Sequence, residues 1–122
     1  MSVVIDASAV LAILFDERGA DVAARSSRSA FLSAVNLIEV REKFARKTGT
    51  AAPVAALLET LGVIVAPFEE QQAILAAELK GRNDSLADRA CLALAATRGL
   101  PVVSADRAWA DLDVGVEIRL IR

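Results

Sequence analysis

Residues 2–15 read SVVIDASAVLAILF, and this stretch sets the expected class of fold. Its β-branched start predicts a short strand over residues 2–5, and residues 8–15 predict a helix that is apolar on nearly every face. A strand that leads straight into a buried helix is typical of a parallel sheet covered by helices on both faces. The stretch therefore predicts a strand–helix unit with Asp6 at the junction.

The same alternation of strand and helix continues along the chain. Further strands are predicted over residues 30–34, 63–66, 101–104 and 116–120, and helices over residues 16–28, 35–47, 53–61, 69–80 and 85–98, with a turn at residues 81–84 and a last short helix before the terminal strand. Asn36 is predicted to cap the helix of residues 35–47. This order predicts an α/β fold, a mostly parallel central sheet flanked by helices, in a single domain over residues 1–122.

Length and composition exclude several classes of protein. The chain has 122 residues, and no apolar run reaches the roughly 18 residues of a membrane span. Its net charge of -2 provides no overall basic field for non-specific nucleic-acid binding. The lone cysteine, Cys91, excludes a disulfide framework, and the first residues lack the basic start of a secretory signal. We therefore expect a cytoplasmic protein.

Chemistry in this chain must depend on carboxylates, because the sequence contains neither histidine nor tyrosine. Asp6 and Asp106 follow predicted parallel strands, whose carboxyl ends meet where ligands bind in such sheets. The alternative for each is an N-cap or a turn that satisfies backbone N–H groups.

Two further carboxylates come from predicted helices. Asp88 shares a helix face with Leu92 and Ala95, which would turn it inward; the alternative is an ion pair with an arginine or an ordinary place in the first helical turn. Glu39 lies off the apolar stripe of its helix, so a solvated face is its alternative, and Glu42 could take its place.

Convergence of these acids would require a cation. Each pair of like charges about 4 Å apart costs roughly 4 kcal/mol at an effective dielectric constant near 20. Oxygen ligands without histidine or cysteine select a hard divalent ion, Mg²⁺ or Mn²⁺. Such ions promote phosphodiester hydrolysis without a side-chain base.

Four segments, VVIDASAVLAIL, NLIEV, SLADRACLALA and VVSADRAWADL, resemble in order and spacing the PIN-domain nucleases, and most closely the VapC-type ribonuclease toxins of bacterial toxin–antitoxin pairs. The resemblance implies an acidic metal site at Asp6, Glu39, Asp88 and Asp106, with Ser104 orienting the pocket and Asn36 as a supporting polar group. It also implies an RNA substrate, a homodimer and a cognate antitoxin that inserts a basic side chain into the acidic pocket.

The sequence therefore predicts a Mg²⁺- or Mn²⁺-dependent endoribonuclease, a hydrolase, as the toxin of a type II toxin–antitoxin pair. Residues 79–89, LKGRNDSLADR, are shorter than the usual connection in the family, which leaves open a binding module on a PIN scaffold with impaired catalysis. A phospho-acceptor receiver domain is a weaker alternative, because it needs two adjacent acids after the first strand, where this chain has Asp6-Ala7.

Secondary candidates concern contact with RNA. Trp109 could stack a base, and packing in the core is its alternative. The basic side chains that could line an RNA groove, or simply cover solvated helix faces, are Arg18, Arg25, Arg28, Arg41, Lys43, Arg46, Lys47 and Arg82.

Overall fold

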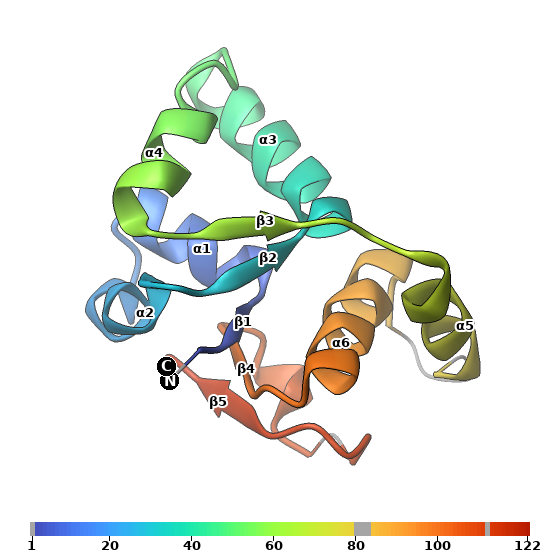
Figure 1. Ribbon diagram of the computed structural model, residues 1–122. Helices are drawn as coiled ribbons and strands as arrows, with labels where there is room; N and C mark the ends of the chain where they lie inside the picture. Colours follow the sequence, from blue (N-terminus) through green and yellow to red (C-terminus); the bar gives the residue numbers. More distant parts are fainter. Residues whose placement is uncertain (1, 80–83, 112) are drawn as a thin grey trace.

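The core of the fold is one parallel sheet. The computed structural model describes residues 2–79, 84–111 and 113–122, and its five strands stand in the order β3-β2-β1-β4-β5 (Figure 1). They are β1 (Val4–Ile5), β2 (Phe31–Ser33), β3 (Ile64–Ala66), β4 (Val102–Ser104) and β5 (Ile118–Leu120). All neighbouring pairs are parallel. The predicted α/β class is confirmed, and within the described residues the sheet is entirely parallel.

Helices cover both faces of this sheet (Figure 1). They are α1 (Ala7–Leu14), α2 (Ala20–Ser27), α3 (Ala34–Thr48), α4 (Val54–Leu61), α5 (Glu70–Glu78), α6 (Leu86–Arg98) and a 3₁₀ turn, η1 (Arg107–Trp109). The first four pack on one face, whereas α6 and η1 pack on the other and α5 lies against α6. None of the helices in the described parts of the chain is long and apolar enough to cross a membrane.

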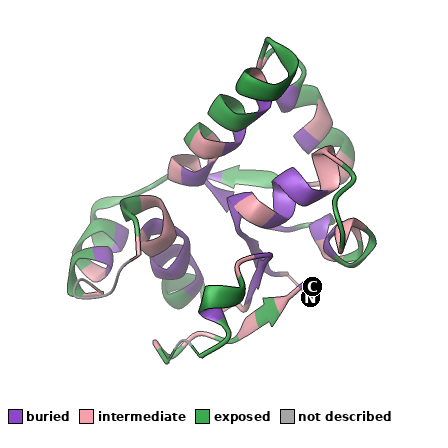
Figure 2. Ribbon diagram, turned by 180° about the vertical axis from the view of Figure 1, so that it is seen from behind, coloured by how far each residue is buried: buried purple, intermediate pink, exposed green. Residues whose placement is uncertain are grey.

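The strands divide the core into two apolar clusters. Ile5 and Val103 belong to the cluster under α1–α4, whereas their neighbours Val4 and Val102 belong to the cluster under α6. This alternation follows from the period of two in a strand, which sends successive side chains to opposite faces. Figure 2 shows the buried residues gathered on the central strands and on α1 and α6.

Several predicted boundaries move in the structure. The second helix begins at Ala20 rather than at residue 16, because Asp16 (φ 52°) and Gly19 (φ 90°) form a left-handed turn first. A Cβ atom on Gly19 would lie 2.6 Å from the carbonyl oxygen of Ile121, so this close approach requires glycine. The predicted last helix is a single 3₁₀ turn. Most of the turn predicted at residues 81–84 falls outside the described residues.

The predicted cap of α3 was wrong. Ser33, not Asn36, occupies the N-cap, and its hydroxyl accepts a hydrogen bond of 3.2 Å from the backbone N–H of Val35. Asn36 lies inside the helix and is fully buried. Propensity places both residue types at helix starts, but the end of β2 determines where the helix begins.

Candidate functional site

The candidate site lies beyond the carboxyl ends of β1 and β4. These strands are neighbours, but the chain runs from β1 to β2 and β3 on one side and places β4 and β5 on the other. Such a switch in strand order opens a crevice in which ligands bind to parallel sheets. Asp6 directly follows β1, and Ser104 is the last residue of β4.

Asp6 is a buried carboxylate, only 4% exposed. Its Oδ2 accepts hydrogen bonds from Ser8 Oγ at 2.6 Å and from Ser104 Oγ at 3.1 Å. Burial raises the pKa of Asp6 to about 6; the two hydroxyls lower the pKa, and the charges of Asp88 and Glu39 raise it. No Lys or Arg in the described parts of the chain forms an ion pair with Asp6. Among the described residues, its side-chain hydrogen-bond partners are two neutral hydroxyls.

Asp88 has a structural role in the first turn of α6. Ser85 Oγ accepts from the Asp88 N–H, and the Asp88 carboxylate accepts from the Ser85 N–H, each at 3.1 Å. This capping box matches the first-turn interpretation of the sequence. Burial nevertheless raises the pKa of Asp88, the bonds to Ser85 lower it, and the charges of Glu39 and Asp84 raise it. Asp88 is thus a cap and also one of the interacting acids.

Glu39 lies on the half-buried side of α3. Its carboxylate pairs with Lys43 Nζ at 3.3 Å, one helical turn away. The ion pair agrees with a solvated face, but the charge of Glu39 also raises the pKa values of Asp6 and Asp88. Three of the four predicted acids are therefore within electrostatic reach of one another.

Asp106 is the fourth predicted acid. Its Oδ1 accepts from the Ala108 N–H at 3.0 Å and so caps η1, while its own N–H donates to Ser104 Oγ at 3.0 Å. The charge of Asp106 is not among the groups that shift the pKa of Asp6. The capping interpretation is confirmed, and a role as a metal ligand stays a prediction.

Asn36 links the two helices that carry Glu39 and Asp88. Its Nδ2 donates to the carbonyl oxygen of Ala87 at 3.0 Å. Its Oδ1 is buried and has no hydrogen-bond partner among the described residues. The predicted supporting group therefore acts on the backbone beside Asp88.

Ser8 is the site residue that the sequence reasoning missed. Its hydroxyl binds Asp6 and also accepts a hydrogen bond of 2.9 Å from the Ala105 N–H. The spacing Asp-x-Ser at the end of a strand could have indicated this role, because a hydroxyl at the second helical position lies next to the side chain of the N-cap residue.

Cys91 and Trp109 contribute to the core. Cys91 is fully buried, and burial raises the pKa of its thiol well above the ordinary value, as do the nearby charges of Asp6, Asp88 and Glu39. Trp109 is 1% exposed and packs in the cluster under α6, which confirms the core-packing alternative and rules out base stacking.

Several of the basic side chains predicted to line an RNA groove contact other groups of the protein. Arg25 pairs with Asp21 at 3.1 Å, Lys43 pairs with Glu39, and the Lys47 ammonium lies 4.2 Å from the centre of the Phe15 ring. Arg82 lies outside the described residues.

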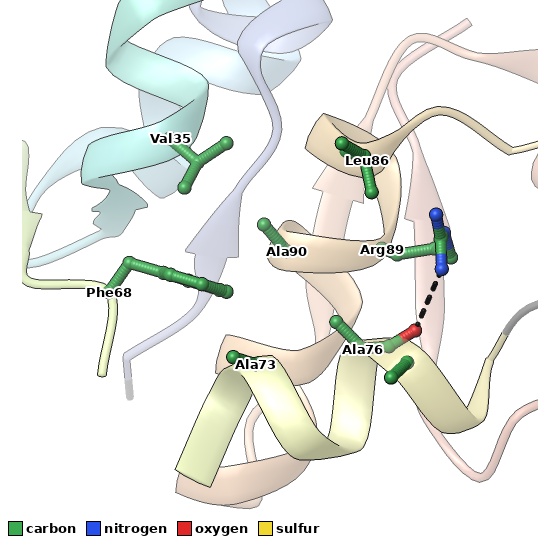
Figure 3. Close-up of a pocket in the computed structure, with 8 residues that line it drawn as sticks. Val35, Phe68, Ala73, Ala76, Leu86, Arg89 and Ala90 are labelled. Atoms are coloured by element: carbon green, nitrogen blue, oxygen red, sulfur yellow. Dashed lines mark hydrogen bonds between the residues drawn. The ribbon is translucent and has the colours of Figure 1, made fainter. Parts of the chain in front are cut away.

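An apolar pocket of about 310 Å³ lies between α5, α6 and the start of α3 (Figure 3). Val35, Phe68, Leu86 and Ala90 are among its lining residues. Arg89 lies beside it and donates to the carbonyl oxygen of Ala76 at 3.2 Å. Among the described residues, no carboxylate lines this pocket.

The acidic residues fit a hard divalent cation by charge and donor type. In the described ranges, no three His, Cys, Asp or Glu side chains come close enough to hold a metal ion among themselves. Mg²⁺, however, keeps several waters and is usually bound through one or two carboxylates. The buried Asp6 carboxylate, which has no basic partner in the part of the chain that the structure describes and is under the electrostatic influence of Asp88 and Glu39, meets that requirement.

Comparison with known proteins identifies the family. The sequence matches the PIN domain over residues 3–115. The chain belongs to the PIN-domain family. No curated protein sequence matches this PIN domain significantly.

Solved structures share the fold of this PIN domain. It is similar to a toxin–antitoxin complex from Klebsiella pneumoniae, with a TM-score of 0.80 and 16% identity over 98% of each chain. It is also similar to DNA-bound VapBC from Salmonella typhimurium, with a TM-score of 0.76 and 19% identity over 100% of this chain and 99% of the other. For VapC20 of Mycobacterium tuberculosis, a Sarcin-Ricin loop cleaving toxin, the TM-score is 0.68 and the identity 22% over 94% of this chain and 98% of the other.

Proposed function

We propose that this PIN domain is a cytoplasmic endoribonuclease that hydrolyses RNA phosphodiester bonds with Mg²⁺ or Mn²⁺, and that it is the toxin of a type II toxin–antitoxin pair. The observation that carries the proposal is the Asp6 carboxylate, which is buried at the switch point of the sheet, has no ion pair with a Lys or Arg of the described ranges, and lies near the charges of Asp88 and Glu39. Similarity to toxin–antitoxin complexes and to a toxin that cleaves the Sarcin-Ricin loop supports the choice of an RNA substrate.

Each site residue has a role in this proposal. Asp6 and Asp88 would hold the ion, with Glu39 and Asp106 as further acidic groups, while Ser104 orients Asp6 through its bond of 3.1 Å. When bound, a divalent ion supplies positive charge to the phosphodiester and activates water. The residues of this chain contribute by positioning the ion, because the sequence contains no histidine for proton transfer.

The proposal includes protein partners. Exposed apolar side chains, including Ile74 at 56% and Leu86 at 73%, lie on α5 and α6 near the apolar pocket. Large exposed apolar residues are typical of interaction surfaces. We propose that a cognate antitoxin and a second copy of this chain cover such surfaces. Light scattering of the chain alone would test the homodimer, and light scattering after co-expression with a candidate antitoxin would test the second partner.

Replacement of the acids tests the enzymatic proposal. Asp6→Asn and Asp88→Asn should abolish Mn²⁺-dependent cleavage of RNA, whereas Asp113→Asn, which removes an exposed carboxylate elsewhere, should leave cleavage unchanged. Circular dichroism should show that all three variants are folded. Undiminished cleavage by both site variants, or full activity in EDTA, would contradict the proposal.

A binding module without catalysis is the second candidate. The absence of a closed three-residue metal cluster among the described residues favours it. A titration with Mn²⁺ separates the candidates, because a resolved binding isotherm together with metal-dependent cleavage supports the enzyme.

The receiver-type alternative is disfavoured by the strand order, since receivers place β1 between β2 and β3, whereas here β1 lies between β2 and β4.

A further inference from the structure

The Ser8 hydroxyl lies where three parts of the site meet. It is on the first turn of α1, it bonds the Asp6 side chain at 2.6 Å, and it accepts from the Ala105 N–H, which follows β4, at 2.9 Å. One hydroxyl thus joins the end of β1 to the loop after β4.

The positions of the hydroxyl protons follow from these contacts. A serine hydroxyl has a single proton to donate. Ser8 Oγ accepts from the Ala105 N–H and Ser104 Oγ accepts from the Asp106 N–H. The two hydroxyl oxygens also lie 3.3 Å apart, but each is closer to Asp6 Oδ2 than to the other. Asp6 Oδ2 lies 2.6 Å from Ser8 Oγ and 3.1 Å from Ser104 Oγ. An ionised carboxylate oxygen can only accept hydrogen bonds, so both hydroxyls donate their protons to this oxygen.

The two oxygens of Asp6 are therefore not equivalent. Oδ2 is committed to two donors, whereas Oδ1 accepts no hydrogen bond from the described residues. Oδ1 is also not one of the side-chain atoms that are buried without a hydrogen-bond partner. It is the oxygen left for a ligand.

We propose that Ser8 is a positioning residue of the metal site: by holding Asp6 Oδ2 against the end of β4, it keeps Oδ1 in place for the divalent cation. The inference rests on the proposed function. An O–H···O⁻ bond of this length is in the range of strong, charge-assisted bonds. Residues that hold metal ligands in this way typically change metal affinity about 10- to 100-fold when removed.

The test measures Mn²⁺ binding to the whole chain by isothermal titration calorimetry, with no RNA present. Ser8→Ala should raise the Kd for Mn²⁺ about tenfold or more. Ser8→Thr, which restores the hydroxyl, should return the Kd close to that of the wild type.

Ser27→Ala is the matched control. Ser27 is a buried serine, whereas Ser8 is half-buried, and the Ser27 hydroxyl lies 2.8 Å from the Ala24 carbonyl oxygen and 2.9 Å from that of Leu61, away from the acids. Its removal should lower the melting temperature without changing the Kd for Mn²⁺. If Ser8→Ala does not fold, Ser8→Cys replaces it, because a thiol is a weaker donor of similar shape and should weaken binding in the same direction.

The outcomes separate the inference from the proposed function. A Kd within twofold of wild type for Ser8→Ala, with a loss of melting temperature like that of Ser27→Ala, would make Ser8 purely structural and overturn the inference alone. Failure of the wild-type chain to bind Mn²⁺ would overturn the proposed metal site and the inference with it.

Discussion

The side-chain amide of Asn36 donates a hydrogen bond of 3.0 Å to the main-chain carbonyl of Ala87. This bond joins the first turns of α3 and α6. Glu39 lies one helical turn after Asn36, and Asp88 directly follows Ala87. The bond thus restrains the distance between two acids that repel each other, and a buried amide performs this task without adding charge.

Removal of this amide should weaken both the fold and the site. Asn36→Ala removes this hydrogen bond between α3 and α6, which costs about 0.5–1.5 kcal/mol of unfolding free energy. It should also lower Mn²⁺ affinity, because the helices that carry Glu39 and Asp88 are no longer tied together. Urea denaturation and calorimetry measure the two effects.

Thr48→Ala is the control at the other end of α3, where the threonine hydroxyl bonds the Phe44 carbonyl at 2.8 Å. It should lower stability only. Equal Mn²⁺ affinity in Asn36→Ala and wild type would show that the bond does not affect the site.

Asp6→Asn should stabilise the metal-free protein at neutral pH. The pKa of Asp6 is raised from 3.8 to about 6, so the folded state holds this proton more tightly than the unfolded chain. The stability from the protonated form is complete below pH 3.8 and is lost as the pH rises through 6, a change of about 3 kcal/mol. The asparagine carbonyl can still accept from the two serine hydroxyls.

Urea unfolding in EDTA at pH 4 and pH 7.5 checks this expectation. The variant should be as stable as wild type at about pH 4 and more stable, by up to about 3 kcal/mol, at the higher pH. A variant that is less stable than wild type at both pH values would indicate that Asp6 serves the fold.

Mn²⁺ affinity should depend on pH through the same group. A carboxyl group must lose its proton to bind a metal ion, and Asp6 does so only near pH 6. Affinity should therefore fall about tenfold per pH unit below 6 and level off above about 7. Asp113→Asn should show the same profile, whereas a flat profile from pH 5 to 8 would place the ion at another group.

Two substitutions at Asp88 should separate its cap from its charge. Asp88→Asn retains an oxygen acceptor for the Ser85 N–H, so the fold should be kept while Mn²⁺ binding is lost. Asp88→Ala removes the acceptor as well and should cost a further 1 kcal/mol, approximately, of unfolding free energy. Ser85→Ala, which breaks the other half of the capping box, should reduce stability but retain Mn²⁺ binding. Tight Mn²⁺ binding by Asp88→Asn would remove Asp88 from the metal site.

Asp106→Asn tests the acid whose carboxylate caps η1. The amide oxygen can still accept from the Ala108 N–H, so the melting temperature should change little. If Asp106 is a metal ligand, Asp106→Asn should lower Mn²⁺ affinity at least about tenfold. An unchanged affinity would leave Asp106 with its structural role alone.

The helices and strands could be predicted because their signals are local. The run of residues 2–15 shows a strand and a buried helix within a few residues of each other, and Gly49, Gly62 and Gly99 stand at the ends of three helices. Ser33 as the cap of α3 could not be predicted in this way, because the cap depends on where β2 ends in the folded sheet.

The order of apolar and polar residues was enough to indicate a parallel α/β fold, and it marked Asp6 as a residue at a strand end. Hydrophobic periodicity carries that information within each segment. The hydroxyl bonds on Asp6 Oδ2 arise differently, because Ser104 is 98 residues away along the chain. Only the pairing of Ile5 with Val103 in the folded sheet brings them together. Folding thus settles which polar groups hold Asp6, because the register of the sheet sets distances that local sequence does not encode.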